Sequence, residues 1–577
     1  MYLRRCGGSK SGQSNTYWQL VESVRTERGP RQRVVSYLGA LSAPVCESIP
    51  VADEERGWFW KRQVFEEDLD PSWQEIDTGH VRIERMRDFG AAWLALQVAD
   101  ILGLPEFLAK AIPIGQAEIG WDIVSRVLVV CRLVSPSSEL HIAECLYERT
   151  ALEDLLGLPA DKINDDRLYR SLDKLLLCKD ALEIHLKKRF EGLFAIEYDL
   201  LLYDVTSTYI EGEGARNDQM KRGYSRDHRR DCKQVCIALV VTRCGMPLGY
   251  EVFDGNTTDV TTVKQIVTRV ETRYGKADRI WVMDRGMMSE DNIEFLKEEG
   301  RRYILGASRA TLKKFEQELL QDNWSEIRDG LDVKLCTSED GTETYILCRS
   351  RDRQAKEKAM HEKFEKQIEE GLTAMAAGCQ KKKQSVATIN QRVGALLAKN
   401  SRAKRLFRVD VQTREDGGAD VSWEKVEAQR NWSELSEGCY LLRSNIMDWS
   451  AEDLWKAYIQ LTEAETAFRI QKDDLKLRPI WHQKKERVQA HILVCFLAFV
   501  VWKTFGQLCK RAHLGDEPRQ VLDEIAQIKI VDVVMHTRSG QEIRRRCVTE
   551  PTGSQKILLH MLKIRLPKQI RIMRNVV

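Results

Sequence analysis

The spacing of hydrophobic residues changes several times along the chain, and each change marks a region with a different predicted structure. Residues 1–80 contain short alternating stretches separated by glycine and proline, which predict a small β-rich domain. From residue 81 to 196, apolar residues recur at intervals of three and four, so we expect a helical domain there. This helical domain is a candidate for DNA binding, although periodicity does not reveal its role.

Residues 197–310 show the most regular succession of predicted elements. Apolar stretches place strands at 200–206, 235–242, 248–253, 279–283 and 303–307, and helical periodicity places helices at 260–273 and 289–299. The resulting order, β-β-β-α-β-α-β, predicts an α/β fold with a mixed five-stranded sheet flanked by helices.

The regular order ends at residue 310. Residues 311–445 combine acidic-glycine turns, several tryptophans and a charged helical segment, and we interpret them as an insertion domain with mixed strands and at least one exposed helix. Strong helical periodicity returns in residues 446–510. Residues 511–577 are expected to form a separate C-terminal region, a candidate for dimerisation or DNA contact.

The composition is that of an ordinary globular protein. Hydrophobic residues make up 43% and charged residues 31%, which argues against extensive disorder. The length of 577 residues predicts three to five folding units. The formal net charge of +3 is too close to neutral to identify a nucleic-acid partner. Evidence for such a partner must therefore come from local basic clusters.

Cysteine usage and apolar runs bear on the cellular compartment. The 15 cysteines show no paired CxxC spacing, which indicates reduced thiols and a cytoplasmic protein. The first residues never develop the apolar run of a signal peptide. The longest apolar run, residues 492–502, has 11 residues, whereas a membrane span needs about 20, so we expect a buried helix and no membrane association.

Two aspartates stand in apolar strands where a charge is unfavourable. Asp204 lies inside the predicted strand 200–206, and Asp284 follows the predicted strand 279–283 directly. A buried carboxylate costs several kcal/mol unless it is paired or bound to a metal, so a salt bridge and a catalytic site are the alternatives. Because open sheets place their sites at strand ends, the position of Asp284 favours the catalytic site.

A glutamate on a predicted helix completes the candidate set. Tyr458, Leu461, Glu465, Phe468 and Lys472 are separated by 3, 4, 3 and 4 residues and therefore share one helix face. An amphipathic core stripe explains the tyrosine, leucine and phenylalanine. It does not explain a carboxylate and an ammonium in the same buried stripe, whereas a metal ion and a phosphate group would supply partners for both.

Three carboxylates on separate elements predict a metal site. Mg²⁺, with Mn²⁺ as a substitute, suits such a site because hard dications prefer oxygen ligands. Two ions held there activate a water or a 3′ hydroxyl and stabilise the departing oxygen, which is the chemistry of phosphoryl transfer. No nucleotide cofactor is expected, since the glycine-rich stretch 7–12 is followed by Gln13 where a phosphate-binding loop needs lysine.

Several short motifs resemble the DDE transposases of bacterial insertion sequences. They are Tyr203-Asp204-Val205-Thr206-Ser207-Thr208, Arg222-Gly223-Tyr224-Ser225-Arg226-Asp227 and Met283-Asp284-Arg285-Gly286. Tyr458, Glu465 and Lys472 also match the branch with a Tyr-Arg-Glu-Lys signature around the third carboxylate, except that Leu461 stands where the arginine is expected. Because of that replacement, the hairpin intermediate known in some relatives is not predicted.

The resemblance covers about residues 197–505 and implies a ribonuclease H-like catalytic core in two parts, 197–310 and 446–510, with a β-rich insertion at 311–445. It also implies that Asp204, Asp284 and Glu465 are the catalytic metal ligands, and that Tyr458 and Lys472 contact phosphate at the transposon end. The implied partners are double-stranded DNA, at the terminal inverted repeats and in the target, and a second copy of the chain, since relatives act as homodimers. The implied location is the bacterial cytoplasm, at the nucleoid.

A basic loop follows the first predicted strand of the core. Between Lys221 and Lys233, six basic residues stand against two acidic ones, which gives a local charge of +4. Arg222, Tyr224 and Arg226 in this loop are predicted to contact DNA by phosphate binding and base stacking, and a solvated loop is the alternative.

Further polar residues lie on and beyond the predicted helix of Glu465. Arg469 is on that helix and is also predicted to contact DNA. His482 and His491 are nine residues apart, which would place them on opposite faces of a helix and argues against a zinc pair.

Three functions remain open at this point. The first is a transposase that cleaves the ends of its insertion sequence and joins the 3′ hydroxyls to target DNA, and the presence of all three carboxylates favours it. The second is a ribonuclease H-like DNA nuclease without strand transfer. The third is a non-catalytic DNA-binding regulator derived from a mobile element, which would be expected to have lost a carboxylate.

Overall fold

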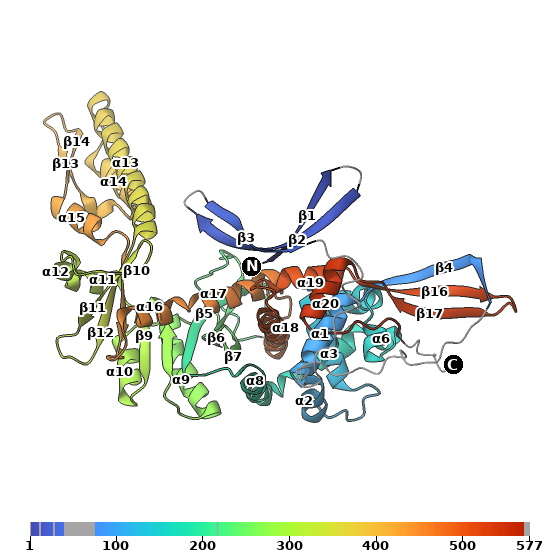
Figure 1. The fold of residues 1–577 in the computed structure, drawn as a ribbon. Coiled ribbons are helices and arrows are strands. Elements are labelled where there is room, and N and C mark those ends of the chain that lie inside the picture. The colour runs from blue at the N-terminus through green and yellow to red at the C-terminus, as the bar shows by residue number, and fades with distance from the viewer. Residues whose placement is uncertain (1, 11–12, 27–28, 40–74, 216, 571–577) are drawn as a thin grey trace.

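The computed structural model describes residues 2–10, 13–26, 29–39, 75–215 and 217–570. At the N-terminus, β1 (Tyr2–Lys10), β2 (Gln13–Thr26) and β3 (Gly29–Gly39) form an antiparallel sheet in that order (Figure 1). Part of the β-rich region expected at 1–80 falls on residues 40–74, which lie outside the described residues.

A nine-stranded mixed sheet forms the centre of the protein. Its strand order is β10-β11-β12-β15-β9-β8-β5-β6-β7. The first five strands along the chain are β5 (Leu200–Ile210), β6 (Lys233–Thr242), β7 (Pro247–Asp254), β8 (Ile280–Met283) and β9 (Arg302–Gly306). With α9 (Asp259–Tyr274) and α10 (Glu290–Glu298), they follow the order β-β-β-α-β-α-β. β8 is parallel to both β5 and β9, and the other pairs are antiparallel.

The sheet is wider than the expected five strands. Four more strands continue it beyond β9, namely β15 (Cys439–Ser444), β12 (Thr344–Ser350), β11 (Leu331–Thr337) and β10 (Ser325–Arg328). They come from residues assigned by sequence to the insertion. Local periodicity does not reveal this, because β15 joins β9 across more than 130 residues of chain.

Alternation along β5 divides the hydrophobic core into two layers. Leu201, Tyr203 and Val205 pack with α9 and α10 on one face of the sheet. Leu200 and Leu202 face the opposite layer, which contains α17 (Thr462–Arg469) and α18 (Lys485–Arg511). Since successive side chains in a strand point to opposite faces, Asp204 lies on the side of α17.

A helical region packs around α18. Its longer members are α1 (Gly90–Ile101), α2 (Leu104–Ala111), α3 (Trp121–Val134), α7 (Asp165–Leu176) and α8 (Lys179–Phe194). Shorter turns lie between α3 and α7: α4 (Glu139–His141), η3 (Ile142–Leu146), α5 (Tyr147–Arg149), α6 (Leu152–Leu156) and η4 (Ala160–Lys162). Among the described residues, α18 alone is a single helix long and apolar enough to cross a membrane, but 83% of its apolar window is buried inside the protein. It is a core helix, which explains why it is hydrophobic all round.

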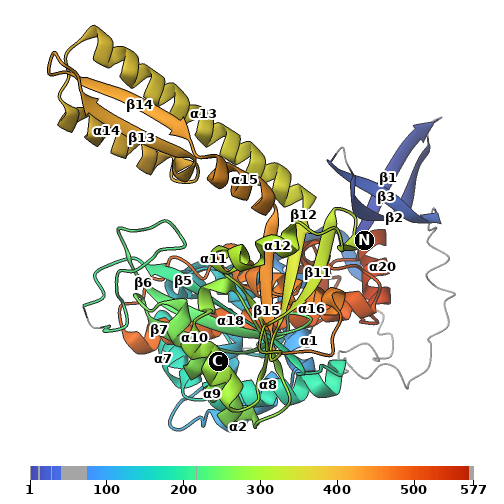
Figure 2. The ribbon, with the colours of Figure 1, turned by 90° about the vertical axis from the view of Figure 1, so that its left-hand side faces the viewer.

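Part of the insertion projects away from the sheet (Figures 1 and 2). The projection consists of α13 (Arg351–Lys381), α14 (Val386–Lys399), β13 (Phe407–Thr413), β14 (Ala419–Lys425) and α15 (Glu427–Ser436). It has a hydrophobic core of its own, in which α13 and α14 cover the two-stranded sheet. The expectation of a β-rich insertion is therefore wrong for this part, in which helix predominates.

Segments from the first and last hundred residues of the chain meet in a further three-stranded sheet. β4 (Ile76–Asp88) pairs with β16 (Lys529–Thr537), which pairs in turn with β17 (Glu542–Val548). Residues 81–88 are thus a strand and not part of a helical domain. Residues 511–577 are not a separate piece either, because α19 (Pro518–Ala526) packs on α1 and α20 (Gly553–Met561) packs on α19. Both errors arise because the pairing of β4 with β16 and the packing of α19 on α1 join segments more than 400 residues apart.

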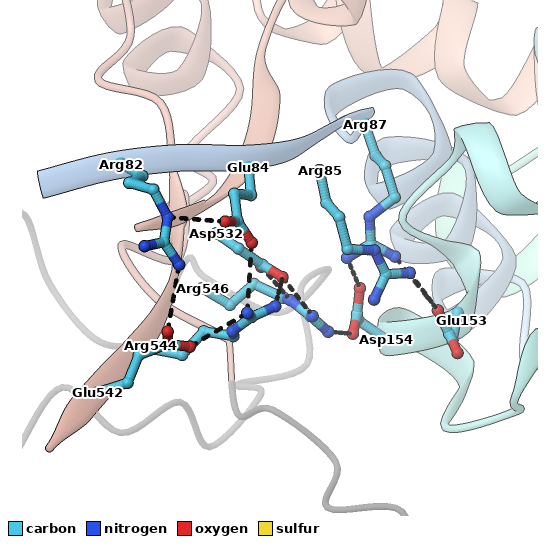
Figure 3. Close-up of polar contacts among 10 residues, drawn as sticks. All are labelled: Arg82, Glu84, Arg85, Arg87, Glu153, Asp154, Asp532, Glu542, Arg544 and Arg546. Carbon is cyan, nitrogen blue, oxygen red and sulfur yellow. Dashed lines mark hydrogen bonds and ion pairs between the residues drawn. The ribbon is translucent and has the colours of Figure 1, made fainter. Parts of the chain in front are cut away.

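Buried ion pairs fasten this sheet to the helical region (Figure 3). The Nε and Nη2 atoms of Arg546 donate to the two oxygens of Asp532 at 2.6 and 2.8 Å, and Arg546 also pairs with Asp154 of α6. Arg87 of β4 reaches the same Asp154, with 2.6 Å between Nη2 and Oδ2. Asp532 is fully buried, so its charge depends on these arginines for compensation.

Candidate active site

Asp204, inside β5, and Asp284, directly after the end of β8, lie side by side on neighbouring parallel strands. The register of β5 and β8 pairs Tyr203 with Met283, so the two aspartates occupy the next position on neighbouring strands. β8 ends there, and Asp284 begins the short 3-10 turn η5 (Arg285–Met287). The sequence predicted both positions from the apolar strands that precede them, and strand pairing brings the carboxylates together.

Glu465 approaches the same place from α17. The pKa of Asp204 is raised to about 7, chiefly by burial, and the charges of Asp284 and Glu465 raise it further. The Val205 amide, which donates to Oδ1 at 2.8 Å, and the charge of Arg226 act in the opposite direction. Both Asp284 and Glu465 are exposed, so the cluster opens to solvent. The charges of Asp284 and Glu465 therefore oppose ionisation of Asp204, and the charge of Arg226 favours it.

The helix that carries Glu465 is interrupted, which corrects the expected stripe. α16 (Ala451–Ile459) ends before α17 begins, and α17 continues into the π-helical turn η8 (Ile470–Asp474). Leu461 and Phe468 are buried as expected, but Glu465 is exposed whereas Lys472 is buried. The break and the wide turn change the helical phase, so Glu465 and Lys472 do not share a buried face.

Lys472 is held by residues of the core sheet and the basic loop. Its Nζ atom donates to Thr206 Oγ1 at 2.8 Å and to Asp227 Oδ1 at 2.9 Å. Arg478 also pairs with Asp227, whose side chain is only 2% exposed. Asp227 ends one of the motifs found in the sequence, but the motif predicted no role for it. Its position directly after the predicted contact Arg226 in a basic loop was the available signal.

Tyr458 contacts the second aspartate. Its hydroxyl donates to Asp284 Oδ1 at 3.4 Å, and burial raises the pKa of this tyrosine. Gly306, at the end of β9, makes room for it, because a Cβ atom there would lie 2.6 Å from the Tyr458 oxygen. The tyrosine therefore stands at the rim of the carboxylate cluster.

The other predicted DNA contacts lie in different settings. Arg222, Tyr224 and Arg469 are exposed, and the exposed fraction of Tyr224 is 82%. Arg226 is partly buried. Its guanidinium donates to Asp259 Oδ1 at 2.6 Å, and its backbone amide donates to Ser207 Oγ at 3.1 Å. The basic loop is thus anchored to β5 and α9 near Asp204.

Arginines that sequence reasoning missed line a hollow of about 420 Å³ beside Asp284. Arg285, Arg309, Arg328 and Arg353 contribute to its wall together with the aromatic residues Tyr440, Trp455 and Tyr458. Arg285 follows Asp284 directly and is the one arginine of these four that belongs to a motif found in the sequence. Arg309 begins the short helix α11 (Arg309–Leu312) after β9, Arg328 ends β10, and Arg353 lies in the first turn of α13. No local pattern connects these segments to the site.

The donor set fits hard divalent cations. Its three carboxylates offer oxygen atoms only. Burial, together with the charges of Asp284 and Glu465, raises the pKa of Asp204, and a bound cation would favour its ionised form. No imidazole or thiol belongs to the cluster among the described side chains.

Comparisons with known proteins identify the class. The model of the transposase DDE domain matches residues 196–501, more than half of the chain. The chain therefore belongs to the DDE transposase family. The model of the IS1634 family transposase N-terminal domain matches residues 3–49, which makes the protein an insertion-sequence transposase of the DDE class.

Other comparisons add little. No curated protein matches the chain. A cryo-EM structure of the piggyBac transposase synaptic complex with hairpin DNA is similar at a TM-score of 0.38 and 8% identity, covering 79% of this chain and 82% of that one. A likeness at that level supports no inference about this protein.

Proposed function

We propose that the protein cleaves DNA at the ends of its insertion sequence and joins the resulting 3′ hydroxyls to target DNA by two-metal-ion phosphoryl transfer. The observation that carries the proposal is the meeting of Asp204, Asp284 and Glu465 from β5, β8 and α17. In this view the core is ribonuclease H-like, and the chain belongs to the branch with the Tyr-Arg-Glu-Lys signature, with Leu461 in place of arginine.

The three carboxylates would hold two Mg²⁺ ions, for which Mn²⁺ would substitute. Bound there, the ions make a water or a 3′ hydroxyl more nucleophilic and stabilise the departing oxygen. Asp204 would contribute a partly buried ligand, and its neighbours Asp284 and Glu465 would contribute exposed ligands that DNA can approach. In the first step a water would attack phosphorus, the bond from phosphorus to the 3′ oxygen would break, and that oxygen would take up a proton to leave a 3′ hydroxyl. In the second step this hydroxyl would attack a target phosphate and lose its proton, and the bond from that phosphorus to the target strand's own 3′ oxygen would break.

Basic and aromatic residues around the cluster would hold the DNA. Tyr458 stands at the rim of the cluster, where its hydroxyl can reach a phosphate oxygen. Lys472 is only 9% exposed, so a phosphate must take the place of Thr206 or Asp227 to meet its ammonium directly. Arg222, Tyr224, Arg226 and Arg469 are proposed contacts farther along the strand. The proposed working complex is a homodimer that bridges two transposon ends in the bacterial cytoplasm, at the nucleoid.

The test is a cleavage and joining assay with Mg²⁺ and DNA that carries the sequences flanking the gene. We expect Asp204→Ala, Asp284→Ala and Glu465→Ala each to lower both rates by about 100-fold or more, because metal ions supply several kcal/mol of transition-state stabilisation. Glu463→Ala is the matched control, since Glu463 lies two residues away on α17 and pairs with Lys503 at 3.0 Å.

Each alternative function has its own outcome. Cleavage without joining by the wild-type protein would favour a nuclease. Binding without cleavage would favour a regulator. If the three variants cleave as fast as the wild type, the assignment of the site is wrong.

A further inference from the structure

A second cluster of metal-binding side chains lies away from the carboxylates. Glu139 begins α4, His491 lies in the second turn of α18, and His482 lies in the segment that precedes α18. Their ligand atoms all lie within 4.8 Å of one another. The imidazole rings of His482 and His491 have centroids 5.4 Å apart. The expectation that these histidines would lie on opposite faces of a helix is therefore wrong, because the helix begins only at Lys485 and His482 folds back from outside it.

The tautomer of His491 leaves one ring nitrogen available to bind a metal ion. Its Nε2 atom lies 3.2 Å from the carbonyl oxygen of Leu477, which can only accept, so Nε2 carries the proton. Nδ1 then has a lone pair, and it is buried without a hydrogen-bond partner. The side chain is 6% exposed, so water does not readily satisfy this nitrogen. A backbone carbonyl that fixes the tautomer of a histidine is typical of the surroundings of a metal ligand.

The other two side chains are also nearly buried and already close. His482 Nε2 is 3.5 Å from Glu139 Oε1, and these side chains are 10% and 7% exposed. Tetrahedral Zn²⁺ holds nitrogen at about 2.0–2.1 Å, which places neighbouring ligand atoms roughly 3.3 Å apart. The glutamate and His482 meet that spacing, and His491 needs a small side-chain movement to do so.

We propose that Glu139, His482 and His491 form a Zn²⁺ site that is distinct from the catalytic carboxylates. Two imidazoles and a carboxylate suit Zn²⁺ better than Mg²⁺, because Mg²⁺ prefers oxygen ligands alone. A water completes the fourth position. Arg132, a buried cation whose charge acts on His491, weakens the attraction for a dication.

The position of the site indicates what the ion does. Residues 476–484 join η8 to α18, and the bound ion would tie this segment to α4 and α18. Ile480 in the segment exchanges backbone hydrogen bonds with Tyr209 and Glu211 at the end of β5, and Arg478 pairs with Asp227. The ion would therefore have a structural role, because it would rigidify the segment that contacts the end of β5 and Asp227.

The experiment is a Co²⁺ titration of the full-length chain after treatment with a chelator. Asp284→Asn is used as the background so that the catalytic cluster is weakened. We expect one equivalent of Co²⁺ to produce the visible absorption bands of tetrahedral coordination, and one equivalent of Zn²⁺ to abolish them. His491→Gln and His482→Gln should each weaken binding by at least about 100-fold, since each removes one of three protein ligands.

Matched controls separate this site from others. His141→Gln changes an exposed histidine two residues from Glu139 and should leave the titration unchanged. If His491→Gln fails to fold, His482→Gln decides the question together with the melting temperature, which Zn²⁺ should raise in the background protein and not in the variant. The proposal is overturned if the background protein shows no tetrahedral bands, or if both histidine variants keep them. Loss of DNA cleavage in the separate catalytic assay would bear on the proposed function and not on this site.

Discussion

The raised pKa of Asp204 predicts a specific pH dependence of metal binding. The carboxylate must lose its proton to bind a cation, and its pKa is about 7 because burial and two neighbouring carboxylates oppose the charge. The ionised fraction then rises from about one tenth at pH 6 to about nine tenths at pH 8. The apparent dissociation constant for Mn²⁺ should fall about tenfold over this range, mostly below pH 7. A carboxylate with the usual pKa would show almost no change.

The prediction can be checked by Mn²⁺ titrations of the full chain, followed by electron paramagnetic resonance of the free ion, at several pH values. The variant Arg226→Gln tests the direction in which the pKa of Asp204 moves. Arg226 lowers the pKa of Asp204, so its removal should raise that pKa and move the change in affinity to higher pH. Arg229→Gln is the matched control, because Arg229 lies in the same loop but pairs with Asp231 and Glu211. A Mn²⁺ affinity that stays constant from pH 6 to 8, or a shift to lower pH in Arg226→Gln, would refute the reasoning.

Three further predictions concern stability and positioning. Asp532→Ala should lower the free energy of unfolding by about 3–5 kcal/mol in urea titrations, because it leaves a buried guanidinium undercompensated, and the exposed Asp516→Ala should cost at most about 0.5 kcal/mol. Equal effects of the two would contradict this account. Asp227→Asn should slow DNA cleavage by about tenfold or more without unfolding the protein, because it releases the side chains of Lys472 and Arg478. Asp231→Asn in the same loop should leave the cleavage rate unchanged. Phe499→Ala should cost about 3–5 kcal/mol, since this side chain is fully buried in α18, and a much smaller loss would show that α18 is not a core helix.

Local sequence was sufficient for the order of the elements in residues 197–310, and it singled out Asp204 and Asp284 as candidates. The strands around Asp204 and Asp284 are apolar and β-branched, so a charge at each position stands out against its neighbours. The succession of strands and helices from 197 to 310 could be written down for the same reason, because each element carries its own period of two or 3.6 residues. The 11-residue apolar run likewise predicted the buried helix α18.

What the sequence could not determine were the contacts between distant segments and the phase of irregular turns. The pairing of β15 with β9, and of β4 with β16, depends on edges that become neighbours only when the chain has folded. Lys472 lies in the π-helical turn η8, and this wide turn points its side chain in a direction that a regular helix would not give it. Lys472 therefore contacts Asp227 and does not share a face with Glu465. The cluster of Glu139 with two histidines has the same origin, since it is assembled from three segments by tertiary packing. The sequence alone thus identified side chains that can bind a metal ion or a phosphate group, and the tertiary structure decided which of them meet.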